Sequence, residues 1–124
     1  MAEIDSILDS VKKNLGIAAE YDVFDHDIIT HINSTFFTLR QLGIGPDMGY
    51  MVTDKEQKWV DFLGAKFEDY SAVKTYVFLK VKLVFDSANS TSFAISALER
   101  QALELEVRLN IFREGELWTS QNQN

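Results

Sequence analysis

Residues 73–112 read VKTYVFLKVKLVFDSANSTSFAISALERQALELEVRLNIF, and this stretch decides the fold. Its first part, residues 73–85, is apolar almost all round, and a helix of that kind needs neighbours on several sides. After a short polar break, apolar residues recur at spacings of three and four, which places them on one face of a second helix. That face consists of Ile95, Leu98, Ala102, Leu105, Leu109 and Phe112. The stretch therefore predicts two packed helices in an all-α domain.

The first half of the chain shows the same helical spacing. One stripe contains Ile4, Ile7, Leu8, Val11 and Leu15, and a longer one runs from Ile28 to Leu42. Polar capping residues and glycines mark where helices start and stop. We expect the first helix to start at Asp5 and end at Gly16, and the second to start at Asp25 and end at Gly43. A short third helix should start with a capping box from Thr53 to Glu56 and end at Gly64. The apolar helix should start at Asp69 or Ser71, and the last helix at Ser90 or Thr91.

Two segments do not fit a helix. Residues 43–50 hold three glycines and the single proline, which predicts a loop, and Tyr50, Met51 and Val52 are candidates for a short β-arm beside it. Residues 115–124 are polar and aperiodic, which predicts a mobile tail. We therefore expect a small all-α bundle of four to five helices over residues 1–114, followed by a flexible tail over 115–124.

Composition narrows the class of protein. The 124 residues favour one domain, and 46% hydrophobic with 25% charged residues is typical of a globular chain. There is no cysteine, so disulfides and thiolate metal sites are excluded. We expect neither a signal peptide nor a membrane span, because the first residues and the apolar runs lack those patterns. The net charge of −7 would repel phosphate backbones, which argues against tight nucleic-acid binding.

No catalytic, cofactor or metal residues emerge from the motifs. The cluster Asp22, Asp25, His26, Asp27 and His31 spaces its histidines five apart, whereas a two-histidine zinc helix needs four. Acids at a helix start are explained by the positive end of the helix. The glycines of the loop do not match a dinucleotide motif. The Asn-Ser-Thr sequence at Asn33 matches the glycosylation pattern, but its mid-helix position favours a chance match.

Three sets of residues are candidates for contacts with partners. Lys74, Lys80 and Lys82 form the basic edge of the apolar helix; they either rest at the rim of the core or pair with acids of a neighbouring subunit. Leu117 and Trp118 lie in the polar tail, where they either anchor a partner or fold back on the domain. The loop offers the apolar residues Ile44, Tyr50, Met51 and Val52 for a subunit or tail contact.

An ordered set of motifs resembles the tailed-phage head–tail connector family, small helical adaptors also labelled DNA-packaging proteins. The motifs are Asp25-x-x-Ile28-x-x-His31-Ile32-Asn33-x-x-Phe36, Leu39-x-Gln41-Leu42-Gly43-x-Gly45-Pro46, Trp59-x-x-Phe62-Leu63, Val73-Lys-Thr-Tyr-x-x-Leu-Lys-Val-x-Leu-x-Phe85-Asp86, and Leu105-Glu106-x-Arg108-Leu109-Asn110. The resemblance covers residues 4–114. It departs from the family pattern at Ser87, where a proline often follows the aspartate.

The resemblance implies a structural virion protein and no enzyme. Its members form a homo-oligomeric ring under the portal protein, extend the channel through which duplex DNA passes without sequence preference, and receive a tail-side stopper or tail-completion protein. It further implies assembly in the host cytoplasm, a final position at the head–tail interface of the virion, no cofactor and no membrane partner. In that setting Leu117 and Trp118 would dock the tail of the chain onto the portal.

One alternative from another class is a helical regulatory or helix-turn-helix module that binds nucleic acid. The acidic balance and the lack of a helix with clustered Arg and Lys stand against it. Salt-dependent binding to duplex DNA at low micromolar protein would favour this alternative. An enzyme is a weaker third choice, because no nucleophile is locally paired with a base.

Overall fold

The computed structural model describes residues 5–46, 48–64, 70–85 and 91–121, with only the backbone described for residues 70 and 111–121. These residues form five helices: α1 (Ile7–Asn14), α2 (Asp25–Gln41), α3 (Trp59–Leu63), α4 (Tyr70–Phe85) and α5 (Ser92–Gln121). The described part contains no strand, and its single isolated β-bridge joins Ser6 to Lys58. The prediction of an all-α bundle of four to five helices is confirmed.

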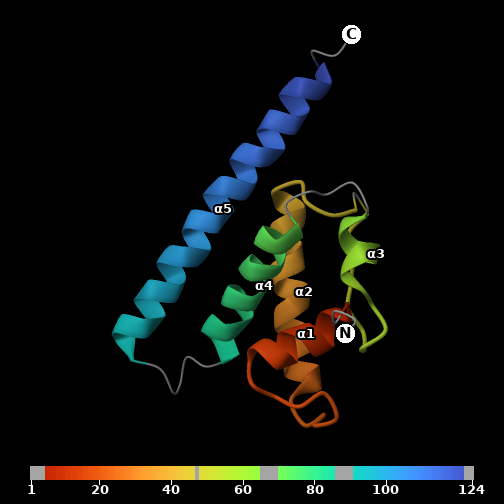
Figure 1. The fold of residues 1–124 in the computed structure, drawn as a ribbon, viewed down its shortest axis with the longest axis vertical. Coiled ribbons are helices and arrows are strands. Elements are labelled where there is room, and N and C mark those ends of the chain that lie inside the picture. Colours follow the sequence, from red (N-terminus) through yellow and green to blue (C-terminus); the bar gives the residue numbers. More distant parts are fainter. Residues whose placement is uncertain (1–4, 47, 65–69, 86–90, 122–124) are drawn as a thin grey trace.

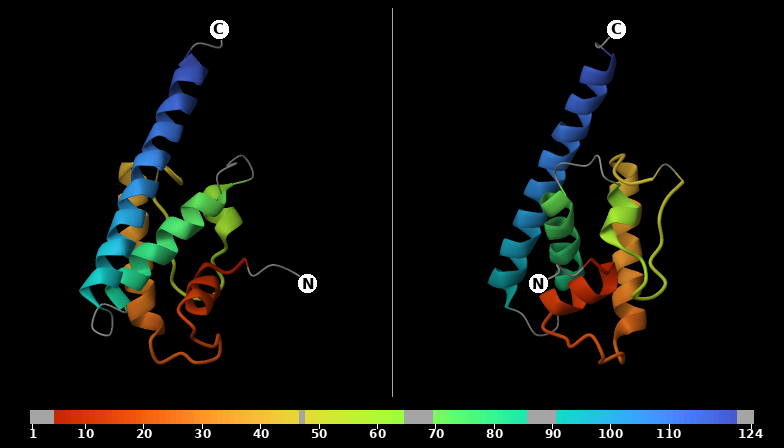
Figure 2. Two further views of the ribbon diagram at one scale, coloured as in Figure 1. Left: turned by 60° about the vertical axis from the view of Figure 1, so that its left-hand side comes forward. Right: turned by 45° about the vertical axis from the view of Figure 1, so that its right-hand side comes forward.

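Helix α4 lies at the centre of the bundle. It packs against α5, α2 and α1, and α5 lies on one side of it while α2 and α3 lie on the other (Figures 1 and 2). Val73, Tyr76, Val77 and Val81 of α4 are buried. The nearly uninterrupted apolar sequence of this helix is explained by neighbours on several sides, as expected for a helix without a polar face.

Helix α5 runs beside α4 in the opposite direction (Figure 1). Three members of its predicted apolar face contact the core, since Ala102 and Leu109 are buried there and Leu105 packs against it, whereas Ile95 and Leu98 are half-buried. The predicted member Phe112 has a side chain outside the described part. At 1.5 Å per residue, the 30 residues of α5 span about 45 Å and the 16 residues of α4 about 24 Å. Helix α5 therefore extends beyond the bundle that it covers (Figure 2).

An aromatic cluster joins α2, α3 and α4 on the other side of the bundle. The rings of Phe36 and Phe62 stack with centroids 4.2 Å apart, and Tyr50 and Trp59 lie against Phe36 at 6.1 and 6.2 Å. Trp59 also meets Phe78 of α4 edge to face at 6.1 Å. Such pairs add to the burial of apolar area, so this cluster fixes the short α3 to the two long helices.

Helix ends were predicted partly correctly. Gly16, Gly43 and Gly64 all have positive φ and follow the helices they were expected to end. Thr91 caps α5, because its hydroxyl oxygen accepts from the amide of Ala94 at 3.1 Å. Helix α4 begins at Tyr70, between the two predicted starts, of which Asp69 lies outside the described residues.

Three predicted N-caps are wrong. Ser6 rather than Asp5 caps α1, and its hydroxyl oxygen accepts from the amide of Asp9 at 3.3 Å. Asp25 is the first residue of α2 and caps nothing, because its carboxylate is engaged by a lysine of α1. The capping box from Thr53 does not form either, since α3 begins only at Trp59. Gln57 instead accepts from the amides of Thr53 and Asp54, which closes a turn before the helix.

The C-terminal segment differs in conformation from the expectation. The backbone of α5 stays helical through Gln121, seven residues beyond the boundary predicted at residue 114. Gly115 costs about 1 kcal/mol relative to alanine inside a helix, and no proline follows to stop the helix. The division into a domain and a flexible tail stays a prediction.

Candidate functional site

The predicted contact loop divides into inward and outward residues. Ile44 and Val52 are buried in the core of the same chain, so they are not available to a partner. Tyr50 is half-buried against Phe36 and Phe62, where burial and then the charge of Asp61 raise the pKa of its hydroxyl. Only Met51 of this set is largely exposed, at 67%. Residues 50–52 form no strand, so the candidate β-arm is not present.

Asn33 holds this loop against α2. Its side-chain oxygen accepts from the amide of Val52 at 2.8 Å, and its side-chain nitrogen donates to the carbonyl of Val52 at 2.9 Å. Because these bonds satisfy both backbone groups of Val52, a loop residue without a strand partner can be buried. Asn33 therefore has a structural role, and its mid-helix position in the sequence was the single hint of that role.

Gly45 allows the loop to pass over the aromatic cluster. Its φ is +92°, and a Cβ placed there would lie 2.5 Å from Cε2 of Phe62. The loop backbone therefore lies directly on the ring that stacks with Phe36. A side chain at this position would both strain the backbone and displace Phe62.

We expect Gly45→Ala to destabilise the fold by about 2 kcal/mol, from the left-handed backbone together with the displaced ring. Gly16→Ala is the matched control, because Gly16 has φ +80° but nothing within 4 Å of its added Cβ. It should cost about 1 kcal/mol, from the backbone alone. Urea unfolding of the three proteins measures both values, and equal losses for the two variants would contradict the proposed contact with Phe62.

The three candidate lysines lie along α4 in different surroundings. The Nζ atom of Lys74 is 5.7 Å from the ring centroid of Trp59, which is the geometry of a cation–π contact. Lys80 and Lys82 are half-buried. This placement fits long stems lying along the rim of the core. Pairing with acids of a neighbouring subunit stays a prediction for all three lysines.

One polar bond crosses between α4 and α5 inside their contact. The hydroxyl of the buried Tyr76 donates to Oε2 of Glu106 at 3.0 Å. Burial, and next the negative charge of Glu106, raise the pKa of Tyr76, so the phenol keeps the proton that it donates. The bond adds a polar contact to the apolar packing of α5 on the bundle, and both hold α5 in its register along α4.

The exposed face of α5 carries apolar residues. Phe93, Leu103 and Val107 are 85%, 62% and 52% exposed, although the opposite face of the same helix packs on α4. Arg108 and Glu104, also exposed, pair with each other along this surface. Leu117 and Trp118 lie on the projecting helical backbone, and their side chains are outside the described part. Helix α5 thus has one face for its own bundle and another that no described residue covers.

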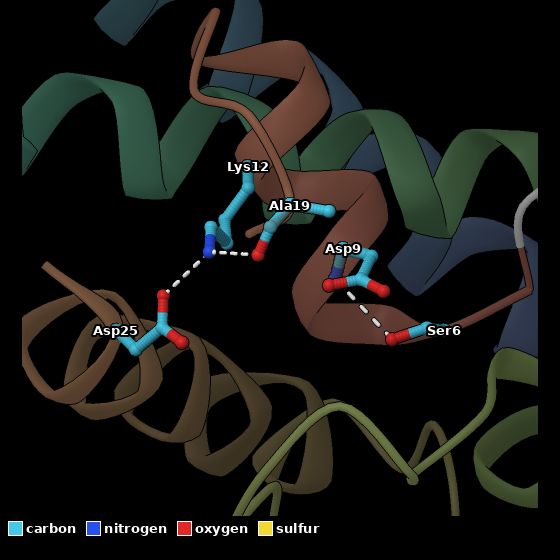
Figure 3. A network of polar contacts seen from close by, with 5 residues as sticks. All are labelled: Ser6, Asp9, Lys12, Ala19 and Asp25. Atoms are coloured by element: carbon cyan, nitrogen blue, oxygen red, sulfur yellow. Dashed lines mark hydrogen bonds and ion pairs between the residues drawn. The ribbon is translucent and has the colours of Figure 1, made fainter. Parts of the chain in front are cut away.

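Sequence reasoning missed an ion pair between α1 and α2. Nζ of Lys12 lies 2.7 Å from Oδ1 of Asp25 and donates to the carbonyl of Ala19 at 2.8 Å (Figure 3). The side chain of Lys12 is 1% exposed and that of Asp25 is 28% exposed. The pair ties the end of α1 to the start of α2. The sequence does hint at a buried lysine, because Lys12 follows Val11 on the apolar side of α1. The spacing of apolar residues in α1 does not, however, indicate that Asp25 is its partner.

The described part of the chain shows neither a metal-binding cluster nor a membrane-spanning helix. Within it, no group of three or more His, Asp or Glu residues is arranged to hold a metal ion. Among the same residues, no helix combines the length and the apolar character needed to cross a bilayer. The candidate functional features of the described part are the projecting α5, the exposed Met51 and the basic edge of α4.

Comparison with known proteins finds a family whose model matches this chain. The family model described as "Phage connector protein" matches residues 7–116. This range includes α1 to α4 and most of α5. No curated protein and no solved structure matches the chain.

Proposed function

Because this chain belongs to the phage connector protein family, we propose that several copies form a ring beneath the portal of the capsid, extend its channel and receive the tail. The membership itself supports a structural head–tail connector role and a location in the virion. Connectors of this family are structural proteins. The ring, the passage of DNA and the identity of each neighbour are the finer parts of the proposal.

The observation that carries the proposal is the projection of α5. Helix α5 is about 20 Å longer than α4, and the C-terminal part that extends beyond the bundle gains little from its own domain. A neighbouring subunit or ring supplies the missing contact surface. Leu117 and Trp118 lie on this projecting backbone, and we assign them to docking on the portal, since aromatic residues dominate the energy of many interfaces.

A closed ring requires two different patches on each subunit that fit each other. The exposed face of α5, with Leu103 and Val107, is one candidate. The second is the edge of α4 with Lys80 and Lys82, which would meet acids of the neighbouring copy. Met51 is the remaining candidate of the loop for a subunit or tail contact, because the other members of that set face the core or the aromatic cluster.

The charge of the chain supports passage of DNA without retention. A net charge of −7 gives few sites for phosphate, and tight binding of duplex DNA depends on contacts from lysine and arginine. An acidic ring would therefore let packaged duplex slide. This is the opposite of what a nucleic-acid-binding module requires.

Mass measurement tests the proposal directly. The purified chain is measured alone and after mixing with the portal protein of the same phage, by native mass spectrometry at several concentrations. We expect a complex in which one portal ring carries many copies of the chain. A chain that stays a monomer at every concentration, and also in the presence of portal, would contradict the ring.

A further inference from the structure

One end of the molecule is the place where α2 and α5 begin and α4 ends (Figure 1). Aromatic side chains from the loop before α2 and from the end of α4 meet there. The rings of Tyr21 and Phe24 have centroids 5.9 Å apart, and Phe24 meets Phe85 edge to face at 5.4 Å. Val23 lies between Tyr21 and Phe24 in sequence. We call the four residues Tyr21, Val23, Phe24 and Phe85 the aromatic end patch.

The aromatic end patch is exposed despite its size. Val23 is 65% exposed, Tyr21 49% and Phe24 38%. Single exposed apolar residues are ordinary, but a group of them gathered by ring contacts between two segments marks an interaction surface. The ring contacts hold Tyr21, Phe24 and Phe85 in place before any partner arrives, which lowers the ordering cost of binding.

The charges around the patch indicate the chemistry of its partner. Glu20, Asp22 and Asp27 are exposed in the same segment, while Lys82 lies in the last turn of α4. The surroundings are therefore negative on balance. Interfaces place opposite charges against each other, so the partner should present an apolar anchor flanked by lysine or arginine. A duplex of DNA does not fit, because its phosphates would face the acids.

The position of the patch indicates which partner this is. It lies at the end of the bundle remote from the C-terminal projection of α5 (Figures 1 and 2). On the proposed function, that projection meets the portal, so the opposite end faces the tail. Resting on that function, we propose that the aromatic end patch is the docking site for a tail-side protein, whose contact segment carries an apolar anchor with basic residues beside it.

The test uses phage heads that are assembled and filled with the variant connector. Tyr21→Ser with Val23→Ser removes the two most exposed members of the patch. The matched control is Phe37→Ser with Met48→Ser, which removes exposed apolar residues of 61% and 91% outside the patch. The amount of connector per head is measured by quantitative mass spectrometry. Joining is measured by mixing the heads with purified wild-type tails and scoring complete particles by electron microscopy and infectivity.

We expect the patch variant to enter heads at the wild-type level and to join tails at least about tenfold less well, as for loss of one or two interface anchors. The control variant should join normally. Asp22→Lys with Asp27→Lys, a second variant on the exposed surface, should also reduce joining, and added salt should slow the wild type.

Two results would overturn the inference. Tails that join the patch variant at the wild-type rate would show that the patch is not used. A variant that keeps its helical circular dichroism but fails to enter heads would show that the patch contacts the portal or a second copy instead. Absence of the wild-type chain from heads is a separate outcome, because it would remove the proposed function itself.

Discussion

Ending the chain after Arg113 is expected to abolish its incorporation into phage heads while the bundle stays folded. The cut removes the part of α5 that projects beyond α4, including Leu117 and Trp118. It leaves the buried residues Ala102 and Leu109 and the bond from Tyr76 to Glu106 in place. Circular dichroism should therefore show a folded helical protein. Quantitative mass spectrometry of purified heads should find no truncated chain above background.

A second truncation separates the apolar pair from the mere length of the helix. Ending the chain after Thr119 keeps Leu117 and Trp118, so this variant should enter heads normally. Full-length Leu117→Ser with Trp118→Ser should fail as the longer truncation does, because the anchors are lost at full length. If the chain that ends after Arg113 joins full heads, the assignment of the α5 end to portal docking is wrong.

The helices and their buried faces could be predicted from the sequence, because they follow from the spacing of apolar residues. Contacts between residues far apart in the sequence could not be predicted. The spacing of Ala102 and Leu109 correctly predicted the buried face of α5, and the apolar sequence of α4 correctly predicted its central position. Both follow from helical periodicity alone. The end of α5 was harder to place, because its polar sequence contains neither an apolar stripe nor a proline, and such a segment can continue a helix that has already started.

The candidate contact residues show the same limit. Ile44 and Met51 are both apolar residues of one loop, yet the first is buried and the second is exposed. Their difference depends on Asn33 and Gly45, which direct the loop across α2 and the ring of Phe62. Neither contact is local in sequence. Composition and spacing could name the loop as a candidate surface, but only the path of its backbone separates the residues that a partner can reach.

The ion pair of Lys12 with Asp25 should dominate the coupling of α1 to α2. Asp25→Ala would leave the buried ammonium with one described partner, the carbonyl of Ala19. Loss of one member of a buried pair costs about 3 kcal/mol. For a domain of this size we expect the melting temperature to fall by about 10 °C. Thermal unfolding followed by circular dichroism measures the loss.

The reciprocal variants identify the cause. Lys12→Met should cost less than Asp25→Ala, because the carboxylate of Asp25 is 28% exposed and water can solvate it once the lysine is gone. The double variant should be more stable than Asp25→Ala alone, since no charge then stays buried without its partner.

Asp27→Ala is the matched control: it also removes an acid from the first turn of α2, but that residue is exposed. It should cost less than about 1 kcal/mol. If Asp27→Ala and Asp25→Ala destabilise the protein equally, the loss comes from the helix end, and the buried lysine does not depend on its partner.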